Sequence, residues 1–131
     1  MLSPILACVD VSLAIDYYTQ KLSFELAWQM PPNASGKTEF ACVKLGDAEI
    51  LLGVAEGFVK AEEIGKRGIG VQIYVNLSET LSIEALYAHA QVRGAQITRA
   101  IQTRDWGERA FNVKDLDGYN LMIAQQVKKP A

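Results

Sequence analysis

The sequence lacks the features that mark nucleic-acid-binding, secreted or membrane-spanning proteins. Its net charge is -2, and Lys and Arg do not cluster outside the pair Lys128–Lys129, so no nucleic-acid surface is expected. No apolar run approaches the roughly 18 residues of a membrane helix, and the first residues, MLSPILACVD, do not resemble a signal peptide. The only cysteines, Cys8 and Cys42, lie in separate strand-like segments. We therefore expect a cytoplasmic protein with buried, reduced thiols, while the sequence leaves a single disulfide open.

Familiar catalytic motifs are missing as well. The chain contains no Gly-x-Ser-x-Gly, no Cys-x-x-Cys, no P-loop and no dinucleotide-binding fingerprint. Its one histidine, His89, lies in a predicted helix with no second metal ligand nearby, which is typical of a surface or packing residue. These absences argue against the commonest hydrolytic, redox-thiol and nucleotide-dependent chemistries.

The chain instead carries one pattern of elements twice. In the first half, a short apolar run precedes Asp10, a residue type that caps helices, and the helical pattern VSLAIDYYTQKL follows. The alternating segments SFELAWQM, TEFACVKL and AEILLGVA then predict strands. The second half repeats this order with the strand IGVQIYV, the helix SIEALYAHAQVRG ending at Gly94, and the strands AQITRAIQT, ERAFNVKD and GYNLMIAQ.

The repeat predicts an α+β fold built from two βαβββ modules. The length of 131 residues fits one domain over 1–131, with modules at about 3–55 and 69–126 and a polar connector over 56–68. Helices on one side of each sheet leave the other side uncovered, to be buried against the other sheet, a second chain or a ligand. We therefore expect curved mixed sheets around a cleft, with the binding site in that cleft.

Strand parity assigns residues to the cleft side of each sheet. Regular apolar positions such as Ile73 and Leu121 are expected to pack on a helix, so the alternate positions face the cleft. The predicted ligand-binding set, which includes one loop tryptophan, is Phe40, Glu49, Gln72, Tyr74, Trp106, Asn112, Asn120 and Met122. Amides, aromatic rings and a thioether are typical of a small-molecule pocket.

Some of these residues have structural alternatives. Glu49 could act as a general base or be a solvated carboxylate beside a turn. Trp106 could stack on a planar ligand, plug the hairpin or contact a second chain. Trp28 shares the parity of Phe24 and is expected in the core or at an interface. Arg109 is expected to pair with a carboxylate of the following Asp-x-Asp-Gly turn.

Two segments resemble signatures of the vicinal-oxygen-chelate superfamily, which includes glyoxalase I, extradiol dioxygenases and bleomycin resistance proteins. LACVDVSLAIDYYTQKLSFEL is similar to the family's strand, Asp-capped helix with a Tyr pair, and Leu-Gly-Phe turn, with Ser23 in place of Gly. DWGERAFNVKDLDGYNL is similar to the Trp-Gly-x-Arg-x-Phe-x-Val-x-Asp-Pro-Asp-Gly pattern, with Leu116 in place of Pro. The resemblance covers nearly the whole chain, implies the glyoxalase/bleomycin resistance fold, and points to the bleomycin-resistance-like branch.

The resemblance also implies where a metal would be held. In the family's enzymes, four strands each offer a His, Glu or Gln to a divalent ion, and the corresponding positions here are Ser3, Leu51, Gly70 and Met122. None of them is a competent ligand for a hard metal. The resemblance therefore implies no metal, no other cofactor and no catalytic residues of the family's kind.

We predict a metal-free homodimer that binds a small, partly aromatic molecule, such as an antibiotic, without a nucleic-acid or membrane partner. Because the net charge of -2 is only weakly acidic, a highly cationic ligand is not expected. Two alternatives stay open. One is a metal-dependent lyase, isomerase or dioxygenase with atypical ligands, and the other is an interaction module whose cleft is filled by its partner chain.

Overall fold

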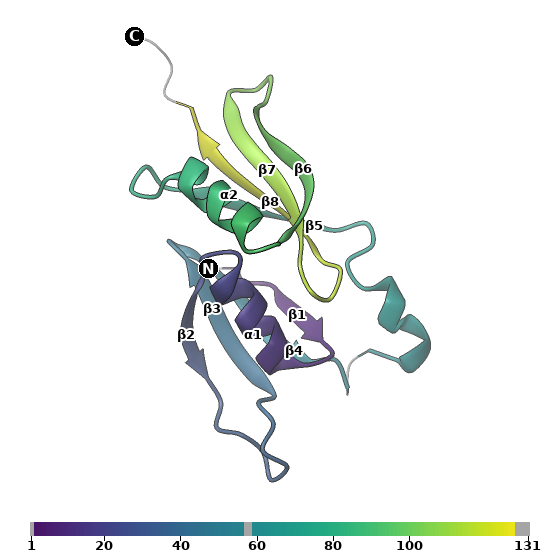
Figure 1. Ribbon diagram of the computed structural model, residues 1–131. Helices are drawn as coiled ribbons and strands as arrows, with labels where there is room; N and C mark the ends of the chain where they lie inside the picture. Colours follow the sequence, from purple (N-terminus) through teal and green to yellow (C-terminus); the bar gives the residue numbers. More distant parts are fainter. Residues whose placement is uncertain (1, 57–58, 128–131) are drawn as a thin grey trace.

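The two halves of the chain form two separate four-stranded sheets, each with its own helix (Figure 1). The structure is a computed structural model that describes residues 2–56 and 59–127, so part of the predicted connector (57–58) and Lys128–Lys129 lie outside the described residues. The strand orders are β1-β4-β3-β2 and β5-β8-β7-β6, with the outer pairs β1–β4 and β5–β8 parallel and the other neighbours antiparallel. The predicted α+β fold with its two mixed sheets is confirmed.

The elements follow the predicted order closely. The strands of the N-terminal sheet are β1 (Ile5–Cys8), β2 (Glu25–Gln29), β3 (Phe40–Leu45) and β4 (Ala48–Val54). The strands of the C-terminal sheet are β5 (Gln72–Leu77), β6 (Gln96–Thr103), β7 (Glu108–Lys114) and β8 (Asn120–Gln126). The helices are α1 (Val11–Gln20), α2 (Ile83–Val92) and, in the connector, a 3-10 helix (Ala61–Lys66).

Both α-helices begin and end where their capping residues place them. The side chain of Asp10 accepts a hydrogen bond from the Leu13 N–H at 3.0 Å, and Ser82 accepts one from the Ala85 N–H at 3.2 Å. Each bond satisfies a backbone donor that has no partner within the helix. Gly94 closes α2 with φ +76, a left-handed conformation that glycine adopts without steric cost. The predicted capping roles of Asp10 and Gly94 are confirmed.

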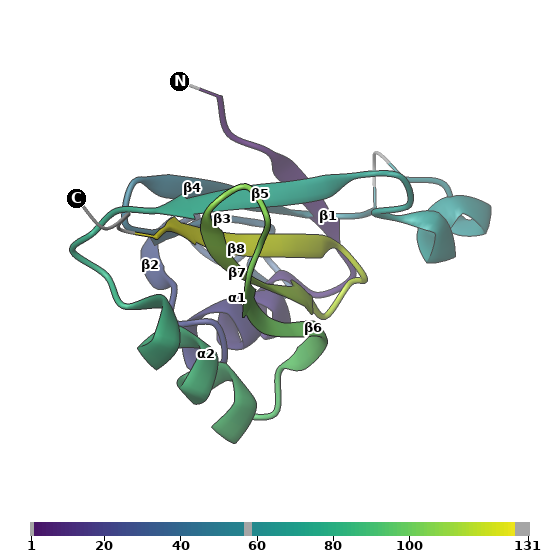
Figure 2. The same ribbon diagram turned by 90° about the horizontal axis from the view of Figure 1, so that it is seen from above.

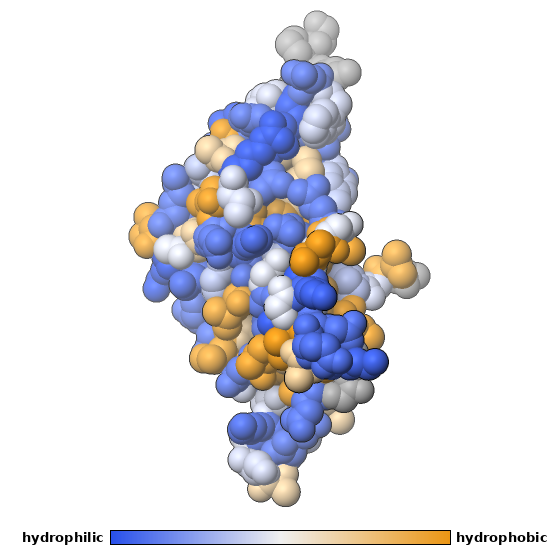
Figure 3. Space-filling view, turned by 90° about the vertical axis from the view of Figure 1, so that its right-hand side faces the viewer, coloured by the Kyte–Doolittle hydropathy of each residue, from blue (hydrophilic) through white to orange (hydrophobic). Residues whose placement is uncertain are grey.

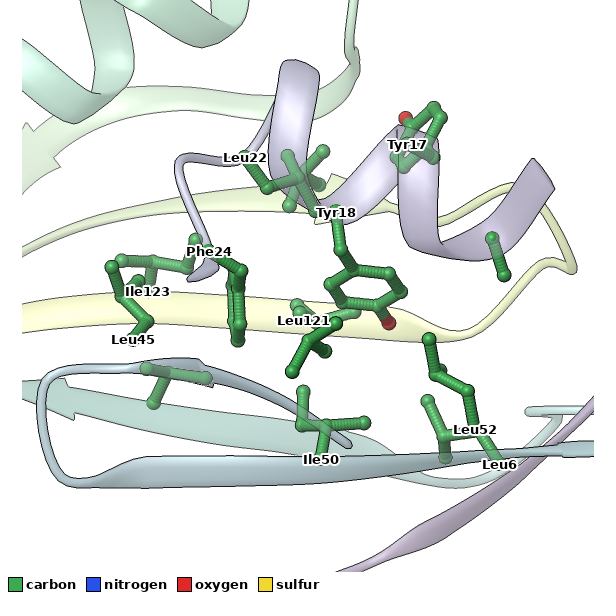
Figure 4. Close-up of a cluster of buried hydrophobic side chains, with 14 of the residues drawn as sticks. Leu6, Tyr17, Tyr18, Leu22, Phe24, Leu45, Ile50, Leu52, Leu121 and Ile123 are labelled. Carbon is green, nitrogen blue, oxygen red and sulfur yellow. The ribbon is translucent and has the colours of Figure 1, made fainter. Parts of the chain in front are cut away.

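The inner faces of the two sheets share one hydrophobic core, and α1 lies across it (Figure 4). Ile50 and Leu52 of β4 belong to the same buried cluster as Leu121 and Ile123 of β8, and the ring of Tyr18 points from α1 into this cluster. Complete burial of one leucine or isoleucine side chain stabilises the fold by roughly 1.5–3 kcal/mol. Figure 2 shows both helices on the same side of the strands, so the opposite sides of the sheets have no helical cover.

The β7–β8 turn fastens the two modules together. Asp115, only 4% exposed, accepts a hydrogen bond from the Tyr18 hydroxyl of α1 at 2.7 Å. Asp117 pairs with Arg67 at 2.6 Å, and the same guanidinium nitrogen donates to the Ala7 carbonyl of β1 at 2.8 Å. The acidic turn therefore contacts α1, β1 and the connector, and its role is structural.

Two side-chain expectations are overturned. Arg109 pairs with Glu84 of α2 and not with the acidic turn, because Arg109 lies on the inner face of β7, beside that helix. Cys8 and Cys42 are both buried and free, so the alternative of a disulfide is wrong. Burial raises the pKa of both thiols, and the neighbouring carboxylate of Asp117 adds to the effect at Cys8.

Within residues 2–56 and 59–127, neither α-helix is long and apolar enough to cross a bilayer.

Candidate functional site

The sides of the sheets that point away from the shared core are their open faces. Cross-strand partners lie on the same face, so the strand register assigns residues to each face. The N-terminal open face carries Ile5, Trp28, Phe40, Cys42, Glu49 and Leu51. The C-terminal open face carries Gln72, Tyr74, Arg99, Asn112, Asn120 and Met122. In Figure 3, hydrophobic side chains reach the surface in several patches between hydrophilic ones.

Five of the predicted site residues lie together on the C-terminal open face. Gln72 is paired with Asn120, and Met122 is flanked by Tyr74 on one side and Asn112 on the other. Met122 is 8% exposed and forms a small buried cluster with two alanines of the same face. The same face thus offers a small apolar cluster and three amide side chains, which are groups that can contact a small organic molecule.

Phe40 and Glu49 lie on the other sheet. The Phe40 ring packs against the Trp28 indole with 5.7 Å between ring centroids. A Cβ atom at position 53 would lie 3.3 Å from that ring, so Gly53 provides the space for it. Glu49 and Tyr74 both line a pocket of about 180 Å³ between β4, β5 and the N-terminal segment. The predicted set is therefore divided between two faces.

Trp106 lies at the tip of the β6–β7 hairpin and is tied to the C-terminal open face. Its indole Nε1 donates to the Glu108 carboxylate at 2.6 Å, and 59% of the residue is exposed. The Tyr74 hydroxyl donates to the same carboxylate. Partial burial and the hydrogen bond to Glu108 raise the pKa of Tyr74 to about 12. Glu108 thus connects the loop tryptophan to the strand tyrosine, a role that the sequence pattern did not indicate.

A bulge in β2 brings Trp28 to the open face. The register shifts between Leu26 and Trp28, so that Trp28 pairs with Cys42 and is 46% exposed. Phe24, which shares its sequence parity, is buried in the core. The expectation that the two share one face is wrong because the bulge adds a residue and reverses the alternation.

Two further bulges give the C-terminal open face its positive charge. In β6, Ile97 and Ile101 pack against the core, while Arg99 pairs with Asn112 of the open face. Arg104, at the end of β6, is 6% exposed and donates from Nη2 to the Asn112 Oδ1 at 2.8 Å. Burial, and then the charge of Arg99, lower the pKa of the Arg104 guanidinium. Strict alternation cannot predict these placements, and neither arginine was among the predicted site residues.

The residues at the positions implied for a metal do not fit one. Leu51 and Met122 lie on different open faces, and Gly70 lies in the turn before β5. Ser3 offers only a hydroxyl group. In the part of the chain that the structure describes, no three His, Cys, Asp or Glu side chains lie close enough to hold an ion. The chemistry of these side chains does not provide the nitrogen or oxygen ligands that a divalent metal needs.

A pocket of about 460 Å³ lies elsewhere, between the start of α1 and the β2–β3 loop. None of the predicted site residues lines it. The loop satisfies its own polar groups, since the Asn33 side-chain oxygen accepts hydrogen bonds from the N–H groups of Ser35 and Lys37. The hydrogen bonds of Asn33 therefore serve the loop itself.

Known proteins share this arrangement. The family model described as Glyoxalase/Bleomycin resistance protein/Dioxygenase superfamily matches residues 2–123. TioX from Micromonospora sp. ML1 has a TM-score of 0.74 and 21% identity, over 100% of this chain and 99% of that one. A glyoxalase/bleomycin resistance protein/dioxygenase from Alicyclobacillus acidocaldarius has a TM-score of 0.70 and 15% identity, over 98% and 92%. A glyoxalase-related enzyme from Clostridium phytofermentans has a TM-score of 0.69 and 17% identity, over 96% and 94%.

Among curated protein sequences, none matches this chain. At such low identities, the likeness to the solved structures concerns the fold alone.

Proposed function

Because this chain belongs to the Glyoxalase/Bleomycin resistance protein/Dioxygenase superfamily, we propose that it is a metal-free protein that binds a small, planar aromatic molecule. The observation that carries this proposal is the placement of aromatic side chains on two uncovered sheet faces. Trp28 and Phe40 pack together on one face, and Tyr74 and Trp106 are joined through Glu108 on the other. Exposed aromatic groups beside fixed polar groups are typical of ligand sites.

A homodimer would complete the pocket. The N-terminal open face is largely apolar, whereas the C-terminal open face carries amides and guanidinium groups. A two-fold arrangement that places one face of each chain against the other face of its partner yields two equivalent pockets. Each pocket would have an aromatic wall from Trp28 and Phe40, and a polar wall from Asn112 and its neighbours.

The side chains available for metal coordination support a proposal of ligand binding without a metal. The side chains at the implied metal positions are poor ligands, and Arg99 and Arg104 place positive charge on the face that holds Met122. Positive charge on the same face opposes the binding of a metal cation. We therefore assign no catalytic residue and propose sequestration of the ligand, for example an antibiotic, in the cytoplasm, with no nucleic-acid partner.

Intrinsic tryptophan fluorescence tests the proposal. Titration with a panel of planar aromatic natural products should give a saturable change for at least one member. Stacking on an indole contributes about 0.5–2 kcal/mol, so Trp106→Ala should weaken binding by roughly twofold to thirtyfold. Leu116→Ala, which truncates a similarly exposed side chain on another turn, should leave binding unchanged.

Two results would contradict the proposal. One is the absence of any saturable response across the panel. The other is stoichiometric divalent metal in elemental analysis of the purified protein, which would favour the alternative of a metal-dependent lyase, isomerase or dioxygenase.

A further inference from the structure

We infer that the C-terminal open face binds a carboxylate group of the ligand, through Arg104 with Arg99 and Asn112. This inference rests on the proposed function and specifies its ligand as a planar aromatic carboxylate. It assigns the ligand's charge to the Asn112 end of the cross-strand row that continues through Met122 to Tyr74.

Arg104 is a buried cation without a counter-charge. Two other arginines form ion pairs with carboxylates: Arg67 pairs with Asp117, and Arg109 pairs with Glu84. Within the described ranges Arg104 has none, and its Nε is buried with no hydrogen-bond partner. A buried guanidinium with unmet donors is costly, and an anion that approaches it would offset that cost.

The Asn112 amide is oriented by this arginine. Its Oδ1 accepts the hydrogen bond from Arg104 Nη2, so the Nδ2 group, a donor, points elsewhere. Asn112 is itself half-buried on the open face, where Arg99 is its cross-strand partner. Arg99 is exposed and makes no ion pair with any residue that the structure describes. Two arginines thus lie beside Asn112, one bonded to its side chain and one paired with it across the strands, and neither forms an ion pair with a described residue.

The hairpin carries two carboxylates, Asp105 and Glu108, and neither forms an ion pair with Arg104 in the described part of the chain. Glu108 accepts hydrogen bonds from Trp106 and Tyr74, which hold it at the end of β7. It lies four residues from Asn112 along the strand, a span of about 13 Å at the usual rise per residue. Arg104 starts beside Glu108 at the hairpin end, yet its guanidinium reaches back to Asn112. Glu108 is thus bonded to Trp106 and Tyr74 and forms no ion pair with Arg99 or Arg104 among the residues described.

The neighbours of the cationic site define the rest of the ligand. Met122 and Tyr74 continue the same cross-strand row as Asn112, so a carboxylate held there would carry its apolar body across these side chains. Arginine matches the geometry of a carboxylate, and the low exposure of Arg104 strengthens a charge-assisted hydrogen bond. An aromatic acid therefore fits this row better than a neutral or cationic ring system.

A matched pair of probes tests the charge preference. Fluorescence titration with 2-naphthoate and the neutral 2-naphthamide should show naphthoate binding about tenfold to a hundredfold more tightly, the range of a charge-assisted hydrogen bond. Arg104→Gln should remove this preference by weakening naphthoate binding. Arg93→Gln, which removes an exposed charge at the end of α2, should change neither affinity.

Arg99→Gln is a second test in case Arg104→Gln fails to fold. Because Arg99 is exposed, this variant should fold, and it should lower the preference for naphthoate over naphthamide severalfold. Equal affinities for the two probes, or a full preference in the folded arginine variants, would overturn this inference while the proposed function stands. If neither probe nor the wider aromatic panel gives a saturable response, both fail.

Discussion

At the scale of single residues, Tyr18 shows why helix α1 carries a tyrosine where a phenylalanine would pack equally well. The residue is 1% exposed, and its ring meets Phe24 edge-on with 5.1 Å between centroids. Its hydroxyl donates to Asp115 Oδ2 at 2.7 Å across the module boundary. Burial, followed by the charge of Asp115, raises the pKa of Tyr18 well above its ordinary value, so the hydroxyl remains a donor.

We expect Tyr18→Phe to lower the free energy of unfolding by about 1–3 kcal/mol, because a buried carboxylate oxygen loses its donor. Urea denaturation followed by circular dichroism measures the change. Tyr87→Phe is the matched control, since the Tyr87 hydroxyl only accepts a hydrogen bond from exposed Gln91. Its loss should cost less than about 0.5 kcal/mol. Equal effects of the two substitutions would show that the Tyr18–Asp115 bond contributes nothing specific.

At the scale of elements, the β7–β8 turn is organised by one carboxylate. Asp115 Oδ1 accepts from the N–H groups of Asp117 and Tyr119 at 2.9 and 2.8 Å. These bonds close the turn, as side-chain oxygens of Asp commonly do. Leu116, which stands where the related pattern has proline, is 52% exposed. The substitution is tolerated because the position lies at the outside of a turn that the aspartate already holds.

This turn should make stability depend on pH. Burial is the largest effect on Asp115 and raises its pKa above the ordinary 3.8 despite the opposing hydrogen bonds. The folded state then holds a proton more tightly than the unfolded state. The contribution of Asp115 to stability is fully present below the unfolded pKa and declines as pH rises through the raised folded pKa.

The comparison of wild type with Asp115→Asn isolates this effect. Denaturation midpoints between pH 3.5 and 7 should show the advantage of the wild type shrinking as pH rises, because the asparagine cannot titrate. Asp47→Asn, in the exposed β3–β4 turn, should show no such trend. A stability difference that stays constant over this range would mean that Asp115 titrates normally in the folded protein.

The regular parts of these elements follow from the sequence, and the irregular parts do not. Period-two alternation places Ile73 and Leu121 correctly on the inner face, because the pairing of β5 with β8 is unbroken. It fails for Trp28 and Arg99, which follow bulges in β2 and β6. A bulge inserts one residue without a distinctive local pattern, so side chains beyond it change face unpredictably.

Arg104 illustrates a second limit. The residue precedes the hairpin tip, where neither a strand nor a helix period defines a direction. Its guanidinium reaches Asn112 because the pairing of β6 with β7 brings the two residues to one face of the sheet. Such a contact depends on the register of two strands, which the bulges in β6 have shifted. The sequence therefore predicted the amide of the site but not the charge beside it.

At the scale of the whole molecule, the two modules share one core and still leave two faces uncovered. The inner faces meet through α1, and Arg67 of the connector links β1 to the β7–β8 turn. The open faces retain aromatic side chains at the surface, with Trp28 at 46% and Tyr74 at 51% exposure. Exposed aromatic groups of this kind commonly mark contact surfaces for a second chain or a ligand.

If the faces of two chains meet in a homodimer, Trp28 lies within the interface and Val92, on the outside of α2, does not. We expect Trp28→Lys to weaken dimerisation by at least tenfold, because a tryptophan at an interface centre commonly contributes about 2 kcal/mol or more. Val92→Lys, at a residue that is 86% exposed, should leave dimerisation unchanged. Sedimentation equilibrium measures both dimerisation constants, and circular dichroism confirms that the variants are folded.

Since the proposed pocket has one wall from each chain, Trp28→Lys should also weaken aromatic probe binding in parallel with dimerisation. A wild-type chain that stays monomeric at tens of micromolar yet binds the probes would place the complete site on one chain.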